Sequence, residues 1–338
     1  MGAKIPVTII TGFLGSGKTT LIRHLLQNAA ARRIAVIVNE FGDVGIDGEL
    51  LRSCCDRAMG IWELTNGCLC CTVQEEFLPT MQALLARRQE INHIVIETSG
   101  LALPKPLVMA FRWPEVRHAA TVDGVVTVVD GLALAAGQVS ADLEALFAQK
   151  EADPSLQHED TPLEELFNDQ LACADLVILN KADQLTPQQV EQLLSQLRSQ
   201  LPPRIKLLAA QQGQVPAELL LGFNAAVEEN LGQRPSHHDF AEEHDHDEEI
   251  QAVCLEMGAW ELQRLCQSLE QLLQVPDIYR IKGFAAIEGK PMRLVVQGVG
   301  QRLDWFYDRP WQSAEPRQTR LVVIGRQLEQ QTLLSYFG

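Results

Sequence analysis

Two short motifs carry the chemistry for which this chain of 338 residues is best equipped. The first, GFLGSGKT, begins at Gly12 and matches the phosphate-binding pattern G-x-x-x-x-G-K-[ST] at every fixed position. It follows an apolar run at 7–11 and precedes a helical pattern at 19–27. A strand, a glycine-rich turn and a helix N-terminus would point several backbone N–H groups at a phosphate. We expect Lys18 to reach the β- and γ-phosphates and the Thr19 hydroxyl to bind Mg²⁺.

A second apolar run, at 93–97, ends in Glu97 and is followed by Gly100. This is the arrangement of a Walker B strand, with glutamate where aspartate is commoner. Glu97 could hold the Mg²⁺ shell or polarise the attacking water, and Gly100 would let the backbone approach the γ-phosphate. Lys18 and Glu97 are therefore the predicted catalytic residues.

The sequence NKAD at 180–183 follows the apolar run 176–179 and resembles the guanine-specificity motif N-K-x-D. The Asp183 carboxylate can accept two hydrogen bonds from guanine, and adenine offers no such pair of donors. Asn180 would brace the loops, and Lys181 would lie over the base. The alternative interpretation is an ordinary polar surface turn.

The second chemical motif is GCLCC at 67–71, which places three thiols, those of Cys68, Cys70 and Cys71, within four positions. Thiolates are soft ligands that suit Zn²⁺, Co²⁺ and Cu(I). A buried cysteine cluster or a redox pair is the alternative. The acidic, glycine-rich stretch NEFGDVGID that starts at Asn39 adds Glu40 as a candidate for the Mg²⁺ or metal shell, although a solvated loop residue would look the same.

The elements expected to position these groups alternate between strands and helices. Buried apolar runs predict strands at 7–11, 34–38, 93–97, 125–129, 176–179 and 206–208, and helical patterns fall between them. This order predicts an α/β fold, a P-loop NTPase with a doubly wound, mostly parallel sheet, over residues 1–225. The stretch 226–249 is acidic and rich in histidine, which predicts a flexible linker, with metal gathering and a merely solvated segment as the two alternatives. Strand and helix patterns at 250–338 predict a small C-terminal α+β domain.

Composition indicates which classes of partner and compartment are unfavourable for this protein. Lys and Arg total 28 against 44 Asp and Glu, so the net charge is −16, which disfavours nucleic acid as a ligand. No apolar run is long enough to span a membrane. Three of the 8 cysteines lie within four positions, which indicates metal or redox chemistry in a reducing compartment rather than a disulfide framework. We therefore expect a cytoplasmic protein with no membrane partner.

The motifs GFLGSGKTT, NEFGDVGIDGELL, NGCLCC, ETSG and NKAD, in this order, resemble those of the CobW-type metallochaperone GTPases. The stretch DPSLQHEDTPLEELFNDQLACADLVILNKAD resembles the subgroup associated with cobalamin biosynthesis. The resemblance implies slow GTP hydrolysis and metal delivery. It implies phosphate and Mg²⁺ binding by the six consecutive residues Gly15, Ser16, Gly17, Lys18, Thr19 and Thr20. It also implies metal binding by the three motif cysteines and guanine binding by Asn180 and Asp183.

The leading hypothesis is a GTPase that binds Co²⁺ at the CxCC motif with Mg-GTP and delivers it to a client such as a cobalt chelatase. Zinc delivery by a protein of the same family is the first alternative, because thiolates do not separate Co²⁺ from Zn²⁺. A metal buffer or sensor in which nucleotide only locks the fold is the second, and a GTPase switch with redox-active cysteines is the third. A homodimer is possible in each case.

Overall fold

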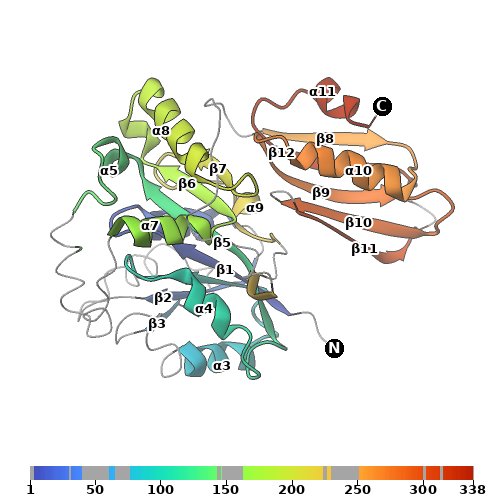
Figure 1. The fold of residues 1–338 in the computed structure, drawn as a ribbon. Helices are drawn as coiled ribbons and strands as arrows, with labels where there is room; N and C mark the ends of the chain where they lie inside the picture. The colour runs from blue at the N-terminus through green and yellow to red at the C-terminus, as the bar shows by residue number, and fades with distance from the viewer. Residues whose placement is uncertain are drawn as a thin grey trace. The chain divides into compact units, whose positions relative to one another are not determined.

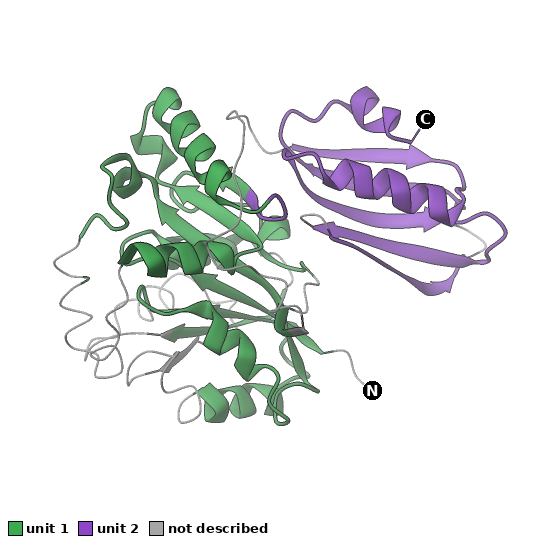
Figure 2. Ribbon diagram, viewed as in Figure 1, with its two compact units in different colours: residues 1–202, 207–245 green, residues 203–206, 246–338 purple. Residues whose placement is uncertain are grey.

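The structure is a computed structural model of the chain, and it describes residues 4–29, 32–39, 61–64, 77–142, 146, 163–223, 227–229, 251–299, 302–312 and 315–337. The chain divides into two compact units (Figure 2), Met1–Pro202 with Leu207–Asp245 and Pro203–Lys206 with His246–Gly338. Of the linker predicted at 226–249, the structure describes residues 227–229.

The first unit contains a parallel sheet. Its described strands are β1 (Ile5–Thr11), β2 (Ile34–Asn39), β3 (Ile61–Leu64), β4 (His93–Glu97), β5 (Ala120–Asp130), β6 (Leu176–Asn180) and β7 (Lys206–Ala209). They lie in the order β3-β2-β4-β1-β5-β6-β7, and β1 pairs in parallel with both β4 and β5. Figure 1 labels the strands β1, β2, β3, β5, β6 and β7 of this sheet. The predicted doubly wound P-loop fold is therefore confirmed.

Within the described ranges, helices follow β1, β3, β4, β5, β6 and β7 along the chain, and parallel pairing requires such long connections between strands. They are α1 (Lys18–Asn28), α3 (Leu78–Ala86), α4 (Pro104–Ala110), α5 (Gly131–Ala135), α7 (Leu163–Ala172), α8 (Pro187–Gln200) and α9 (Ala217–Leu220), with 3₁₀ turns η2 (Ala182–Gln184) and η3 (Val227–Glu229). The start of α8 shows why a helix begins where it does. The Thr186 side chain accepts a hydrogen bond from the Gln189 N–H, while the Gln189 side chain accepts from the Thr186 N–H, which forms a capping box.

Strand β5 is longer than the predicted run 125–129, because it continues through a buried acid and a glycine. The Asp123 carboxylate accepts hydrogen bonds from the backbone N–H groups of Gly222 and Phe223, so its burial is compensated. Gly124 lies beneath the Phe223 ring, where a Cβ atom would come within 2.6 Å of it. Tertiary contacts thus extend a strand that composition alone would have ended.

The short turn η3 is also fastened to β5. The Glu228 carboxylate accepts hydrogen bonds from the Thr121 hydroxyl at 2.7 Å and the Val122 N–H at 2.9 Å, and Glu228 is buried. These residues pack as part of the first unit, in contrast to the flexible linker expected from 226 onward.

A buried polar contact joins the two strands at the centre of the sheet. The Thr8 hydroxyl on β1 donates a hydrogen bond to the Leu220 carbonyl at 3.1 Å. The same oxygen lies 2.9 Å from Nε2 of His93 on β4. Because β1 leads into the phosphate-binding turn and β4 ends at Glu97, this contact connects the strand that precedes Lys18 with the strand that ends at Glu97.

The second unit is an antiparallel sheet with helices. Its described elements are β8 (Gln251–Met257), α10 (Leu262–Leu273), β9 (Ile278–Ala286), β10 (Met292–Val299), β11 (Arg302–Pro310), β12 (Thr319–Gly325) and α11 (Gln330–Ser335). The strand order is β11-β10-β9-β12-β8. Leu265, Leu269, Leu272 and Leu273 of α10 are buried in a core with Ile281, Leu294 and Leu321, as expected for an amphipathic helix on a sheet.

The sequence patterns did not predict β11. Its sequence RLDWFYDRP flanks the aromatic run WFY with charged residues on both sides, and it lies at the edge of the sheet, where Trp305 and Phe306 are 43% and 50% exposed. An edge strand can keep such charges because one side of it has no neighbouring strand. Within the residues that the structure describes, no helix is long and apolar enough to cross a bilayer.

Candidate nucleotide and metal site

The carboxyl ends of the central strands bring the predicted nucleotide residues together. β1 ends at Thr11, β4 at Glu97, β5 at Asp130 and β6 at Asn180, and these strands are neighbours in the sheet. β1 lies between β4 and β5, and the chain forms β2, β3 and β4 on one side of it before it forms β5, β6 and β7 on the other. Ligands of open α/β sheets bind outside such strand ends, at the point where the strand order reverses.

The turn after β1 has the shape of a phosphate cradle. Gly12, Gly15 and Gly17 have φ values of 136°, 76° and 96°, which only glycine adopts without strain. A Cβ atom on Gly12 would stand 2.1 Å from the Val128 carbonyl oxygen, so the turn is pressed against β5. Helix α1 begins directly after Gly17, which aims its first N–H groups at the turn.

Lys18 and Ser16 line this turn with donors. The Lys18 ammonium group donates hydrogen bonds to the Gly12 and Phe13 carbonyls at 2.9 and 3.2 Å, so it is held over the loop that would surround a phosphate. Ser16 is buried, and within the described residues its hydroxyl has no hydrogen-bond partner. A buried hydroxyl without a partner is costly, and an anionic oxygen in the cradle would satisfy it. Gly15 is exposed and Thr20 partly exposed at the same turn.

Thr19 and Glu97 meet across this edge of the sheet. The Thr19 hydroxyl donates a hydrogen bond to Oε1 of Glu97 at 3.0 Å, and Glu97 is 4% exposed. Two oxygen ligands, one of them a carboxylate, fit the preference of Mg²⁺ for hard oxygen donors beside a nucleotide phosphate. The Thr98 N–H donates to the Ile10 carbonyl at 3.0 Å, and the Thr98 hydroxyl donates to that of Thr11 at 2.9 Å. Both bonds fix the ends of β1 and β4 beside one another.

Asn180 joins three loops at this edge. Its Nδ2 donates to the Ser16 carbonyl at 2.9 Å, and its Oδ1 accepts from the Gly213 N–H at 3.0 Å. Gly17 passes so close that a Cβ atom there would lie 2.3 Å from Nδ2. These hydrogen bonds are what the predicted bracing role of Asn180 requires, because one amide connects the phosphate-binding turn to the loop after β7.

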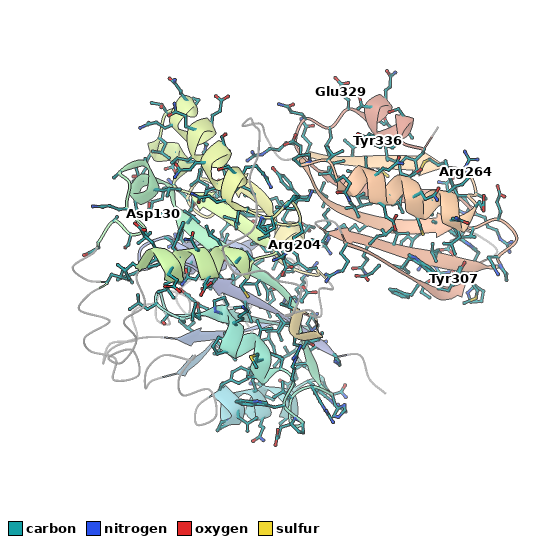
Figure 3. All side chains as sticks on the ribbon, viewed as in Figure 1. Asp130, Arg204, Arg264, Tyr307, Glu329 and Tyr336 are labelled. Carbon is teal, nitrogen blue, oxygen red and sulfur yellow. The ribbon has the colours of Figure 1, made fainter. Side chains whose placement is uncertain are left out.

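Lys181 and Asp183 take different positions. Lys181 has a left-handed backbone, with φ 62°, and its ammonium lies 2.6 Å from Oδ2 of Asp130. Asp183 stands exposed on η2, where its carboxylate is open to a base. Asp130, labelled in Figure 3, is buried at the end of β5, and its Oδ1 also accepts the N–H groups of Leu132 and Ala133 at the start of α5.

Two residues that contact the loops at this edge of the sheet, Asp130 and Gln170, belong to none of the sequence motifs. The sequence could have indicated Asp130, because it comes at the end of the apolar run 125–129 just as Glu97 comes at the end of its own run. No such indication exists for Gln170, since it lies inside the amphipathic pattern of α7. It is nonetheless buried, and it bonds the loop after β4.

The predicted metal ligands Cys68, Cys70, Cys71 and Glu40 lie outside the described residues. Within the described ranges themselves, no group of three or more His, Cys, Asp or Glu side chains could hold a metal ion. The described cysteines are Cys173, which is buried, Cys254, which is exposed, and Cys266, which is partly buried. Burial, followed by the nearby Glu270 carboxylate, raises the pKa of the Cys266 thiol.

Comparison with known proteins agrees with this geometry. The family described as CobW/HypB/UreG, nucleotide-binding domain, matches residues 6–208, and the cobalamin synthesis protein cobW C-terminal domain matches residues 251–338. The zinc chaperone CobW of Pseudomonas aeruginosa is 55% identical over 335 residues, which cover 97% of this chain and 89% of the relative. The zinc chaperone CobW of a Sinorhizobium species is 48% identical over 330 residues, with 95% and 93% covered.

A third relative, the zinc chaperone YjiA of Escherichia coli, is 33% identical over 348 residues and covers 99% of this chain and 98% of its own. Both units of the structure thus fall within matched regions. A phosphate cradle, a threonine–glutamate pair at the strand ends and an N-K-x-D motif occur together in the larger one. The chain therefore belongs to the CobW/HypB/UreG family of GTPases.

Proposed function

We propose that this protein is a GTP-dependent zinc chaperone that binds the metal through Cys68, Cys70 and Cys71 and releases it when GTP is hydrolysed. The observation that carries the proposal is that relatives named zinc chaperones match nearly the whole chain at 55% and 48% identity. The GTPase activity itself follows from the family. The choice of zinc is the proposal, and it replaces cobalt as the leading candidate.

The site geometry supports specific roles in GTP hydrolysis. The residues Gly15–Thr20, which end the turn and begin α1, would hold the phosphates by their backbone N–H groups, with the Lys18 ammonium near the γ-phosphate. Thr19 and Glu97 would hold Mg²⁺, which would neutralise charge on the phosphate oxygens. Glu97 could alternatively orient the attacking water. Asn180 would brace the site, while Asp183, with Lys181 beside it, would bind the guanine base.

The coupling to metal is argued from the chain order. The GCLCC motif lies between the phosphate-binding turn and β4, the strand that ends at Glu97. Glu40 follows β2, which pairs with β4. Nucleotide contacts at the ends of β1 and β4 could therefore set the positions of both metal-ligating segments, as γ-phosphate contacts order the switch loops of other GTPases. Three thiolates leave a position open for exchange, which suits delivery better than storage.

Cobalt delivery is the second candidate. It is favoured by the match of residues 251–338 to a domain described for a cobalamin synthesis protein. In that case the client would be an enzyme such as a cobalt chelatase. A metal buffer or sensor is the third candidate, in which nucleotide binding stabilises the fold without driving release. A homodimer and a cytoplasmic location are compatible with all three.

The deciding experiment is a metal titration of the full chain in three states: with Mg²⁺ and a non-hydrolysable GTP analogue, with Mg-GDP, and without nucleotide. Zn²⁺ binding is followed by competition with a chromophoric chelator, and Co²⁺ binding by thiolate-to-cobalt absorbance. We expect tight binding only with the GTP analogue, tighter for Zn²⁺ than for Co²⁺. Single-turnover GTP hydrolysis should then release Zn²⁺ to the chelator.

Cys70→Ser should abolish the thiolate–cobalt band, and Cys254→Ser, at an exposed cysteine on β8, is the matched control that should leave it intact. Equal affinity in all three nucleotide states would favour the buffer instead. Nucleotide-gated binding that prefers Co²⁺ in the presence of equal Zn²⁺ would favour cobalt delivery.

A further inference from the structure

A buried glutamine holds the loop that follows β4. Gln170 lies on α7, and its side chain is fully buried. Its Nε2 donates one hydrogen bond to the Gly100 carbonyl and one to the Ala102 carbonyl, both at 3.1 Å. An amide group has two donor hydrogens, so both are engaged by this one loop. The two carbonyl acceptors also fix which end of the amide carries the nitrogen.

The same loop touches the phosphate-binding turn on its other side. A Cβ atom on Gly100 would lie 2.6 Å from the backbone nitrogen of Leu14. Gly100 therefore lies between Leu14 of the turn and Gln170 of α7. Any displacement of Gly100 toward or away from a γ-phosphate must change its hydrogen bond to Gln170 as well.

Helix α7 gives this contact a fixed reference. The Thr127 hydroxyl on β5 donates a hydrogen bond to the backbone carbonyl of Gln170 at 2.8 Å. One turn earlier in α7, the Phe167 ring packs on that of Phe13, with centroids 6.0 Å apart. The helix is thus anchored both to the central sheet and to the phosphate-binding turn, so the side chain of Gln170 can position the loop rather than follow it.

The glutamine also retains an unused acceptor. Among the described residues, Oε1 of Gln170 has no hydrogen-bond partner although it is buried. Such an atom is costly in a protein interior, and a buried polar atom without a partner calls for an explanation. A donor that reaches Oε1 in only one nucleotide state would make the hydrogen bonding of Gln170 differ between the two states.

From these contacts we propose that Gln170 is a positioning residue that sets the Gly100 loop for the γ-phosphate and so separates the GTP-bound from the GDP-bound state. It acts through the loop backbone and touches no nucleotide itself. The inference rests on GTP binding at this edge of the sheet and does not depend on which metal the protein carries.

The test compares Gln170→Met with Thr127→Val in the full chain. Methionine has a similar length but cannot donate to the two carbonyls. The Thr127→Val variant removes a buried hydrogen bond to the same residue's backbone and leaves the side-chain amide in place. For each protein, the Kd of Mg-GDP, the Kd of a Mg-bound non-hydrolysable GTP analogue and the kcat of GTP hydrolysis are measured.

We expect Gln170→Met to leave the Kd of GDP unchanged and to weaken the GTP analogue about tenfold, within the range of typical coupling between sites. Its kcat should fall as well. Thr127→Val leaves both the side-chain amide of Gln170 and the packing of Phe167 on Phe13 in place, so it should keep the wild-type ratio of the two Kd values. If Gln170→Met folds poorly, Gln170→Asn, whose shorter amide cannot span both carbonyls, should show the same selective loss.

Equal weakening of GDP and the GTP analogue, or no change in either, would overturn the proposal and leave Gln170 as a structural residue. The wild-type titration keeps this outcome separate from failure of the proposed function. A wild-type chain that binds GTP shows that the site works, whatever the variant does. A wild-type chain with no GTP affinity would remove the basis of both.

Discussion

Replacing Asn180 by alanine should damage both folding and nucleotide binding, because one amide connects two loops. The substitution removes the hydrogen bonds to the Ser16 carbonyl and from the Gly213 N–H, both of which are buried. A buried group left without its partner costs about 1–3 kcal/mol. Partial entry of water should reduce the sum for the two groups, so we expect the free energy of unfolding to fall by about 2–4 kcal/mol.

The measurement is equilibrium urea unfolding of the full chain, together with the Kd of Mg-GDP. Asn28→Ala is the matched control, because the Asn28 amide makes one exposed hydrogen bond, to the His24 carbonyl at 2.8 Å. That variant should lose less than about 0.5 kcal/mol and keep its GDP affinity.

Asn180→Asp separates the two halves of the contact. Its carboxylate can still accept from the Gly213 N–H, but it places a second oxygen against the Ser16 carbonyl. We therefore expect it to be at least as damaging as alanine. A loss below about 0.5 kcal/mol for Asn180→Ala, with unchanged GDP affinity, would refute the bracing argument.

Two further substitutions compare an ion pair with a buried carboxylate and an ion pair that is exposed. Asp130→Asn can still accept the N–H groups that start α5 but loses its charge toward Lys181, so the Kd of GDP should rise about tenfold. Glu90→Gln, in the exposed pair with Arg87, should leave that Kd unchanged, and equal effects would contradict a role for Asp130. In the second unit, two hydrogen bonds lower the pKa of Glu315 from 4.5 to about 2, with the larger effect from the Arg309 side chain and the smaller one from the Gln312 N–H. Since the folded-state pKa lies below the unfolded one, Glu315 stabilises the fold above about pH 4.5, and this contribution is lost as the pH falls toward 2. Arg309→Met should return the pKa of Glu315 toward 4.5, which an NMR titration of the full chain measures, with the Glu315 resonance assigned from a Glu315→Gln variant. A Glu315 pKa near 4.5 in the unsubstituted protein would contradict the pairing.

Sequence patterns were most informative where a residue's role depends on its neighbours in the chain. The phosphate-binding turn, Glu97 and Asn180 each follow an apolar run, and parallel strands bring such positions to one edge. The extension of β5 through Asp123 and the capture of Glu228 depend on partners about 100 residues away, so no local pattern contains them. Gln170 is similar, because it fits the helix periodicity of α7 while its side chain bonds a loop after β4 that lies about 70 residues away in the chain.

In the second unit, strand β11 could not be predicted from its own hydrophobic pattern. Strand β11 exists because β10 offers it an unpaired edge, although its own sequence is interrupted by charges. Patterns of hydrophobicity detect burial, and this strand is largely exposed. Its pairing is therefore a property of the neighbouring strand.

The contact between Thr8 and His93 has a consequence for spectroscopy. A hydroxyl carries one hydrogen, and that of Thr8 is directed to the Leu220 carbonyl, so the bond to His93 requires a proton on Nε2 of the imidazole. This fixes the tautomer of a neutral His93 and places a ring N–H between the strands that lead to Lys18 and Glu97. Its exchange rate with solvent deuterium would report local opening between β1 and β4. A single resonance could then show whether GTP tightens the centre of the sheet or only its loops.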